Sequence, residues 1–318
     1  MANKLYSEES VQGIANAIRA VSGSTSTYTI GEMPAAISSL STGLDWSELN
    51  YDTTGENKGT PVEVISGFNY AKDIMNTYNA NSSYYRDKKL MFFPNIDVTG
   101  RYDYGSIFNQ SALIHCPPLT LGNIEISGTI TCTRMFQETY VEEIVLNSIN
   151  DNTTPGACSN TFQSCLNLKK VRINFPVLNG EYMFENCSKL TDINNFDLTQ
   201  LTNYYPTAMF KNCSSLVNAP AFDTSEVKGF SDFFNNCTHL ENVPLYDSSN
   251  VVTFNNMFNN CSSLNNDSLN NIIKMCSNAT SYTGTKTLRV LGISSSYDTI
   301  IPTLSNYNDF ITAGWTIS

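Results

Sequence analysis

The sequence predicts an α+β repeat fold: a solenoid of stacked turns with a ladder of short strands, preceded by a small helical segment. Two observations predict it. One motif recurs as MFENCSKL from Met183, MFKNCSSL from Met209 and MFNNCSSL from Met257. Seven phenylalanines also follow one another at spacings of 28, 26, 22, 26, 24 and 24 residues, namely Phe108, Phe136, Phe162, Phe184, Phe210, Phe234 and Phe258. A period in the twenties is typical of solenoids.

The two best copies agree over 24 residues. After Phe210 come Leu216, Pro220, Phe222, Asp223, Val227 and Phe230, and the same offsets from Phe234 hold Leu240, Pro244, Tyr246, Asp247, Val251 and Phe254. The first three copies are more degenerate, as terminal repeats usually are. One such turn buries too little apolar surface to fold alone, so we expect the copies to stack.

A small residue stands three positions after the phenylalanine. It is a cysteine in the last five copies and Ser111 or Thr139 in the first two. We expect these cysteines to form a buried, reduced core ladder together with four phenylalanines: Cys165, Cys187, Cys213, Cys237, Cys261, Phe184, Phe210, Phe234 and Phe258. Stacked turns hold the thiols too parallel and too far apart for disulfides. No C-x2-C pair indicates zinc, so we expect no metal and no cofactor.

Two polar positions also repeat. An asparagine precedes each of the last four cysteines, and we expect its amide to bond to the backbone of adjacent turns: Asn186, Asn212, Asn236 and Asn260. Asp197, Asp223 and Asp247 share one offset, and their Ser and Thr neighbours favour a turn-capping role. A bridging cation such as calcium is the alternative.

Composition excludes several partners. The formal net charge is -11 and no run of Lys or Arg occurs, which disfavours nucleic acid and anionic membrane surfaces. No apolar stretch is long enough to insert into a membrane. The N-terminal residues MANKLYSEESVQ lack the apolar run of a secretory signal, which predicts synthesis without export.

Residues 1–40 predict two short amphipathic helices. Ser7 is a plausible N-cap for the first, and Thr29 with Glu32 makes a capping box for the second. Neither apolar stripe can be buried by the pair alone, so we expect docking through Val11, Ile14, Ile18, Met33, Ile37 and Leu40. The partner is a copy of the segment, another protein, or the first turn of the repeats. We expect a linker at 41–60, an N-terminal cap at 61–105, repeats at 106–264 and a C-terminal cap at 265–318.

No catalytic residue is predicted. His239 occupies a position that varies among the copies, and His115 and Cys116 are adjacent, so on a strand their side chains point to opposite faces. A binding surface is the remaining candidate, because exposed aromatic side chains beside amides suit contact with glycans or proteins. The candidate contact residues are Tyr204, Tyr205 and Tyr246.

The stretches FDTSEVKGFSDFFNNCTHL and YDSSNVVTFNNMFNNCSSL resemble the BspA-type leucine-rich repeats of bacterial surface proteins. The match covers about residues 105 to 265. The resemblance implies a leucine-rich-repeat (BspA-like) solenoid and a role in surface adhesion and in protein or glycan recognition, not in catalysis. The C-terminal stretch LRVLGISSSYDTIIPTLSNYNDFITAGWTIS resembles the helix-plus-strand cap that follows such arrays.

The stretch KLYSEESVQGIANAIRAVSGSTSTYTIGEMPAAISSL resembles the short leader of tail-associated and other virion proteins of bacteriophages. This resemblance implies a virion protein, a tail fibre or receptor-binding protein that reaches the outside by lysis. Residues 1–40 would then contact other virion proteins in a homo-oligomer, with a trimer favoured, and the repeats would contact a bacterial surface protein or glycan. A capsid head fibre or decoration protein, or a bacterial surface adhesin, is the alternative.

Overall fold

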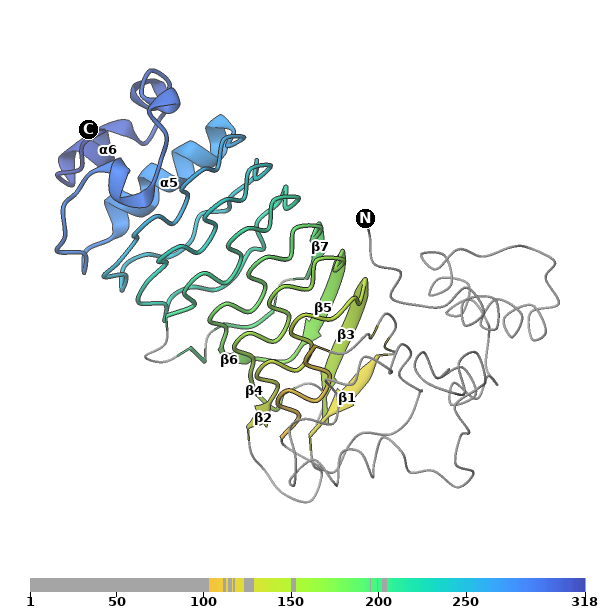
Figure 1. Ribbon diagram of the computed structural model, residues 1–318. Helices are drawn as coiled ribbons and strands as arrows, with labels where there is room; N and C mark the ends of the chain where they lie inside the picture. Colours follow the sequence, from red (N-terminus) through yellow and green to blue (C-terminus); the bar gives the residue numbers. More distant parts are fainter. Residues whose placement is uncertain are drawn as a thin grey trace, which may run out of the picture.

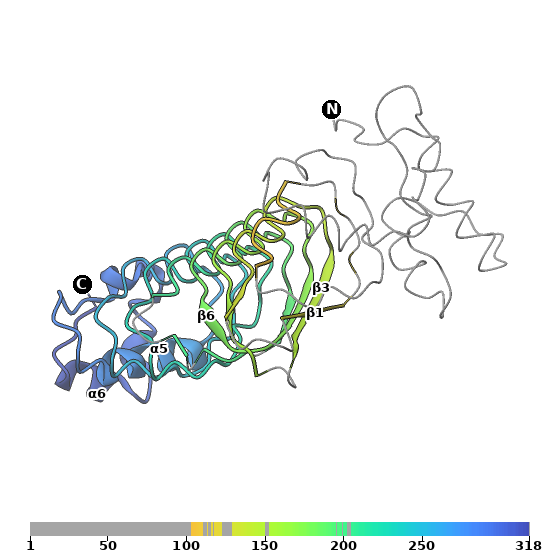
Figure 2. The same ribbon diagram turned by 90° about the horizontal axis from the view of Figure 1, so that it is seen from below.

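The computed structural model describes residues 103–317, apart from 111–112, 114–115, 117, 123–128, 150–152, 195, 199 and 202–204. Within these residues, parallel sheets and few helices form an α+β arrangement without a closed barrel. Successive turns of the chain lie side by side, from β1 at one end to helices α5 and α6 at the other (Figures 1 and 2). The expected docking helices, linker and most of the N-terminal cap lie outside the described residues.

Two parallel sheets cross the N-terminal repeats. One has the order β1 (Leu119–Leu121), β3 (Glu143–Ser148), β5 (Lys170–Asn174) and β7 (Asp192–Ile193). The other consists of β2 (Ile130–Thr131), β4 (Gly156–Ala157) and β6 (Val177–Asn179). Neighbouring strands come from neighbouring repeats, so Val171 of β5 lies between Ile144 and Ile193. Alternate residues of β3 and β5 are buried, and these form one wall of the core.

The strand ladder does not continue through all the repeats, contrary to the sequence expectation. In the described residues after β7, pairing between later repeats is reduced to single bridges, Asn218 with Asn242 and Gly229 with Thr253. Pro220 and Pro244 lie ten residues after their phenylalanines, an offset that falls in the middle of β5. A proline has no N–H to donate to a ladder, so the strand is interrupted there.

The most regular feature is a segment that we call the Phe loop, the five residues centred on each of the seven phenylalanines. In every Phe loop the first and fifth residues are left-handed, with φ between 53° and 65°. The N–H groups of its first, third and fifth residues donate to carbonyls of the next repeat. In the Phe210 loop, Ala208, Phe210 and Asn212 donate at 2.9, 2.9 and 2.8 Å. The same three bonds recur in each loop from Phe108 to Phe234.

The phenylalanine rings stack inside these loops, with neighbouring centroids 5.2–5.8 Å apart. The expected burial of the core ladder is confirmed, because every cysteine and phenylalanine assigned to it is at most 3% exposed. The structure adds a role for the thiols. Each ladder cysteine donates its S–H to the phenylalanine carbonyl of the preceding repeat, at 2.9–3.1 Å. Each thiol therefore donates a hydrogen bond between repeats, in addition to filling a small space in the core.

Burial also fixes the protonation state of the ladder. Loss of solvation raises the pKa of Cys165 to about 11 and that of Cys261 to about 12. The same cause raises the pKa of Cys187, Cys213 and Cys237 well above the usual value. At neutral pH the thiols therefore carry the proton that they donate, and they are poor nucleophiles.

The C-terminal end of the stack is closed by helices. Helix α5 (Asn266–Asn278) begins after Asn265, whose side chain accepts the N–H of Ser268. The 3-10 helix η3 (Leu288–Leu291) then provides the carbonyls for the last Phe loop. Asn256 donates to Val290, and Phe258 donates to Leu291, both at 2.8 Å. Gly292 ends η3 with φ of 77°, and a Cβ there would lie 2.7 Å from Asn259, so only glycine fits.

The rest of the cap consists of η4 (Ser295–Tyr297), η5 (Ile301–Thr303) and helix α6 (Tyr307–Thr312). Trp315 is buried against Phe254, Tyr282 and Phe310, which joins the cap to the last repeat. The helix-plus-strand cap that the sequence resembles is only partly matched. The described residues here contain helices, and the strand is reduced to one parallel bridge, Thr287 with Thr316.

A matched pair of leucines tests the core. Leu216 is fully buried, whereas Leu166 is 57% exposed. We expect Leu216→Ala to lower the free energy of unfolding by about 2–5 kcal/mol, because it leaves a cavity. Leu166→Ala should change it by less than about 0.5 kcal/mol. Urea denaturation of both variants measures the difference, and equal losses would contradict the packing described above.

The buried thiols predict a loss of stability in alkali. Unfolded cysteines ionise near their ordinary pKa of 9.0, whereas folded Cys165 keeps its proton up to about 11. The stabilisation is thus complete below pH 9 and declines as the pH rises towards 11, by up to about 1.4 kcal/mol per pH unit for each thiol. Denaturant unfolding from about pH 8 to about pH 10.5 measures the slope. In Cys165→Ser the free energy of unfolding should depend less steeply on pH, because one fewer thiol titrates. A flat profile in the unmodified chain would refute the account.

Candidate functional site

The two selected tyrosines that the structure describes, Tyr205 and Tyr246, do not form one surface. Tyr205 is 36% exposed and its ring lies over Gly229, where an added Cβ would be 2.6 Å from it. Tyr246 is 1% exposed and donates its hydroxyl proton to the carbonyl of Pro220 at 2.7 Å. Its assignment as a receptor contact is therefore wrong, because it stands at the same offset as the core residue Phe222. Tyr204 lies outside the described residues.

Two of the three repeated aspartates, Asp223 and Asp247, cap turns, as expected. Asp223 accepts the backbone N–H of Ser225 at 3.0 Å, and Asp247 accepts that of Ser249 at 2.9 Å. The bond from the Ser225 backbone lowers the pKa of Asp223. In the part of the chain that the structure describes, no group of three or more His, Cys, Asp or Glu side chains is placed to hold a metal ion.

His239, the histidine among the described residues, is not placed beside a thiol or a carboxylate. His239 is exposed, as expected for a variable position, and its Nδ1 lies 2.7 Å from the carbonyl oxygen of Ser214 in the preceding repeat. His115 lies outside the described residues, and the neighbouring Cys116 is buried. Burial raises the pKa of the Cys116 thiol far above its usual value, so this thiol stays protonated.

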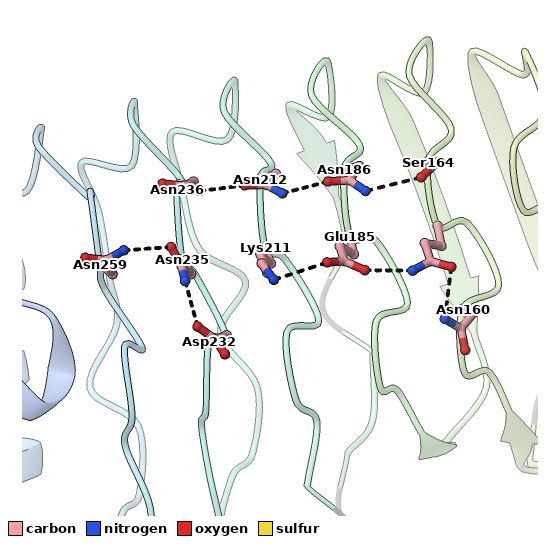
Figure 3. A network of polar contacts seen from close by, with 11 residues as sticks. Asn160, Ser164, Glu185, Asn186, Lys211, Asn212, Asp232, Asn235, Asn236 and Asn259 are labelled. Atoms are coloured by element: carbon pink, nitrogen blue, oxygen red, sulfur yellow. Dashed lines mark hydrogen bonds and ion pairs between the residues drawn. The ribbon is translucent and has the colours of Figure 1, made fainter.

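A row of amides follows the fifth residues of the Phe loops (Figure 3). Asn260 donates to Asn236 at 2.7 Å, Asn236 to Asn212 at 2.8 Å, and Asn212 to Asn186 at 2.6 Å. Asn186 donates to the hydroxyl of Ser164 at 3.2 Å. We expected these amides to bond to the backbone, and that was wrong. The backbone N–H groups of Asn186, Asn212 and Asn236 donate to the next repeat, while the side chains pair with one another.

A second row follows the fourth residues of the same loops, and the sequence analysis missed it. Gln137 donates to Gln163, and Gln163 to Glu185, both at 2.6 Å. Lys211 forms an ion pair with Glu185 at 3.4 Å. Further along, Asn259 donates to Asn235 at 3.1 Å. The signal was present in the sequence, since a polar residue directly follows the phenylalanine in every copy.

We call these two rows together the amide face, defined by the fourth and fifth residues of the Phe loops from Phe136 to Phe258. Most of its side chains are half-buried, and they hold one another in fixed positions along successive repeats (Figure 3). A side-chain amide that donates one N–H and accepts through one lone pair retains a second N–H and a second lone pair. The amide face therefore offers an ordered series of hydrogen-bond donors and acceptors, which suits recognition of a polar partner.

An exposed aromatic belongs to the same loops. Tyr182, the first residue of the Phe184 loop, is 36% exposed and has φ of 54°. A bulky residue rarely adopts this conformation, and the strain costs on the order of 1–2 kcal/mol. The bond from its N–H to the carbonyl of Thr207, at 2.9 Å, holds the residue there. Its ring adds an exposed flat apolar surface of the kind that stacks on sugars or side chains.

Substitutions of Asn212 separate the contribution of its side-chain hydrogen bonds from that of its left-handed backbone conformation. Asn212→Ala removes the bonds to Asn186 and Asn236 and places alanine at φ of 63°. Asn212→Gly removes the same bonds but accepts this φ. We expect both to destabilise the fold, with the alanine variant less stable than the glycine variant by roughly 1 kcal/mol. Denaturant midpoints measure this order, and a more stable alanine variant would contradict the left-handed geometry.

Among the described residues, no helix has the length and apolar character needed to cross a membrane. A family model described as "Mycoplasma protein of unknown function, DUF285" matches residues 176–287. The matched segment includes the Phe loops from Phe184 to Phe258, helix α5 and the start of the cap. No curated protein matches the chain, and no solved structure does.

Proposed function

We propose that the chain is a bacteriophage virion protein, a tail fibre or receptor-binding protein, whose stacked repeats contact the host cell surface. In this proposal the repeats form a BspA-type leucine-rich-repeat solenoid. The N-terminal segment, which resembles phage virion leaders, joins the chain to other virion proteins in a homo-oligomer. The partner on the host is a surface protein or glycan.

The amide face is the observation that carries this proposal. It extends over successive repeats, and its side chains are held by one another at 2.6–3.4 Å. Ordered side chains lose little conformational entropy when a partner binds, which favours affinity. Sugars and polar protein surfaces present hydroxyl and amide groups that match such a series of donors and acceptors.

The chemistry of the described residues supports a binding role in preference to a catalytic one. The ladder thiols are buried and protonated, and the capping aspartates are occupied by backbone N–H groups. The low content of charged residues, 15%, suits a surface that recognises neutral polar groups. Localisation on the virion distinguishes a tail fibre from a capsid protein.

Immunogold electron microscopy of a producing culture, with an antibody to residues 103–317, provides that localisation. We expect gold at the tips of phage tails. Gold on capsids would replace the tail assignment with a head fibre or decoration protein. Gold on cell envelopes, with every particle unlabelled, would contradict the virion proposal and indicate a cellular adhesin.

A charge substitution tests the amide face itself. Gln163→Lys places a positive charge beside Glu185, with which it can pair, so the fold should be kept. Asn308→Lys adds the same charge at an exposed position of α6. We expect Gln163→Lys to weaken binding of the labelled full chain to host cells by about tenfold or more. Asn308→Lys should bind like the unmodified chain, and equal binding by both variants would exclude the amide face as the contact surface.

A further inference from the structure

The first residue of a Phe loop sends its side chain toward the amide face. Asn160, a first residue, donates from its side chain to Gln163, the fourth residue of the same loop, at 3.0 Å. In another loop the fourth residue, Asn235, donates to the side chain of the first residue, Asp232, at 2.6 Å (Figure 3). The backbone φ is 56° at Asn160 and 55° at Asp232. This left-handed conformation therefore directs the first side chain toward the fourth.

Tyr182 holds the first position of its loop, with φ of 54°. The N–H of Glu185, the fourth residue, donates to the carbonyl of Tyr182 at 3.2 Å, and the equivalent bond is present in the loops that begin at Asn160 and Asp232. The same backbone geometry therefore directs the Tyr182 ring toward Glu185. The ring is 36% exposed, and the first residue of the next loop is Ala208, whose methyl group is too short to cover it.

The carboxylate of Glu185 is held in place and can still accept hydrogen bonds. Its Oε2 accepts from Gln163 at 2.6 Å, and its Oε1 lies 3.4 Å from Nζ of Lys211 (Figure 3). A carboxylate has about four lone-pair sites, so these two contacts leave others for hydroxyl donors. The ion pair with Lys211 also offsets the negative charge. The pair therefore suits a ligand that has hydroxyl groups and no charge of its own.

The composition of the amide face favours a glycan over a protein as its partner. Protein interfaces usually have an apolar or aromatic centre that supplies most of the affinity. The fourth and fifth residues of the Phe loops from Phe136 to Phe258 are instead polar in every loop. A sugar needs only one aromatic face for its C–H groups, with polar neighbours for its hydroxyls. The charged residues at these positions, Glu138, Glu185 and Lys211, sum to -1, which disfavours an anionic sugar.

We propose that Tyr182, Glu185 and Lys211 form a subsite for one neutral sugar residue of a host-surface glycan. The C–H face of the sugar stacks on the ring of Tyr182, Glu185 accepts hydrogen bonds from its hydroxyl groups, and Lys211 donates to a hydroxyl oxygen. The amide rows repeat from turn to turn, as hydroxyl groups repeat along a glycan, and they bind the neighbouring sugars. This inference rests on the proposed function and selects the glycan from its two possible partners.

Treated host cells distinguish the two classes of partner. Binding of the labelled full chain is measured on untreated cells, on cells oxidised with periodate, which cleaves the vicinal diols of sugars, and on cells digested with protease. We expect periodate to abolish binding and protease to leave it. Binding that survives periodate would overturn the inference, and its loss after digestion would then identify a protein partner while leaving the proposed function in place. An absence of binding to untreated cells would overturn both.

Substitution of Tyr182 tests the subsite without loss of the fold, because Ala208 already occupies the same position of the next loop with φ of 53°. We expect Tyr182→Ala to weaken binding to untreated cells by about tenfold or more. Tyr182→Phe should keep most of the binding, because the ring remains. The matched control is Tyr140→Ala, since Tyr140 is 37% exposed and lies outside the Phe loops. Denaturant midpoints check that the variants fold, and equal binding by Tyr182→Ala and Tyr140→Ala would refute the subsite.

Discussion

The three backbone hydrogen bonds that each Phe loop donates to the next repeat are the interaction on which the rest of the structure depends. They form because the first and fifth loop residues are left-handed, which directs alternate N–H groups toward the same neighbour. Once these bonds set the register, equivalent side chains of successive repeats must lie beside one another. The stacked rings, the thiol bonds to phenylalanine carbonyls and the amide rows all follow from that register.

This constraint explains why the loops stay regular where the strands do not. Proline at the strand position of the later repeats removes ladder bonds, yet the Phe loops of those repeats keep the same donors and distances. The sheets are thus dispensable in a repeat, whereas the loop is not. It also explains the choice of cysteine at the ladder position. A thiol is small enough for a packed ladder and still supplies a donor for a carbonyl that water cannot reach.

Much of the fold could be predicted from the sequence, because the apolar residues recur at the same offsets in successive repeats and so define the register. The burial of Cys213 and Phe210 follows from an offset shared by several copies. Other features need backbone geometry. The left-handed loop positions decide that Asn212 faces another amide instead of a carbonyl, and spacing alone does not reveal this. Tyr246 was misassigned because a tyrosine can lie in the core if its hydroxyl finds a partner, here the carbonyl of Pro220. The amide face was missed because its residues differ in type from copy to copy while sharing one position.

Scalar couplings across hydrogen bonds, measured by NMR on deuterated protein, test the stacking of the Phe loops most directly. The account predicts couplings from the amide of Phe162 to the carbonyl of Met183, from Phe184 to Met209, and from Phe210 to Phe233. Couplings of these amides to carbonyls of their own repeat, or rapid exchange of the amide protons with water, would contradict it. The repeats would then not share one register, and the amide face would not exist as an ordered surface.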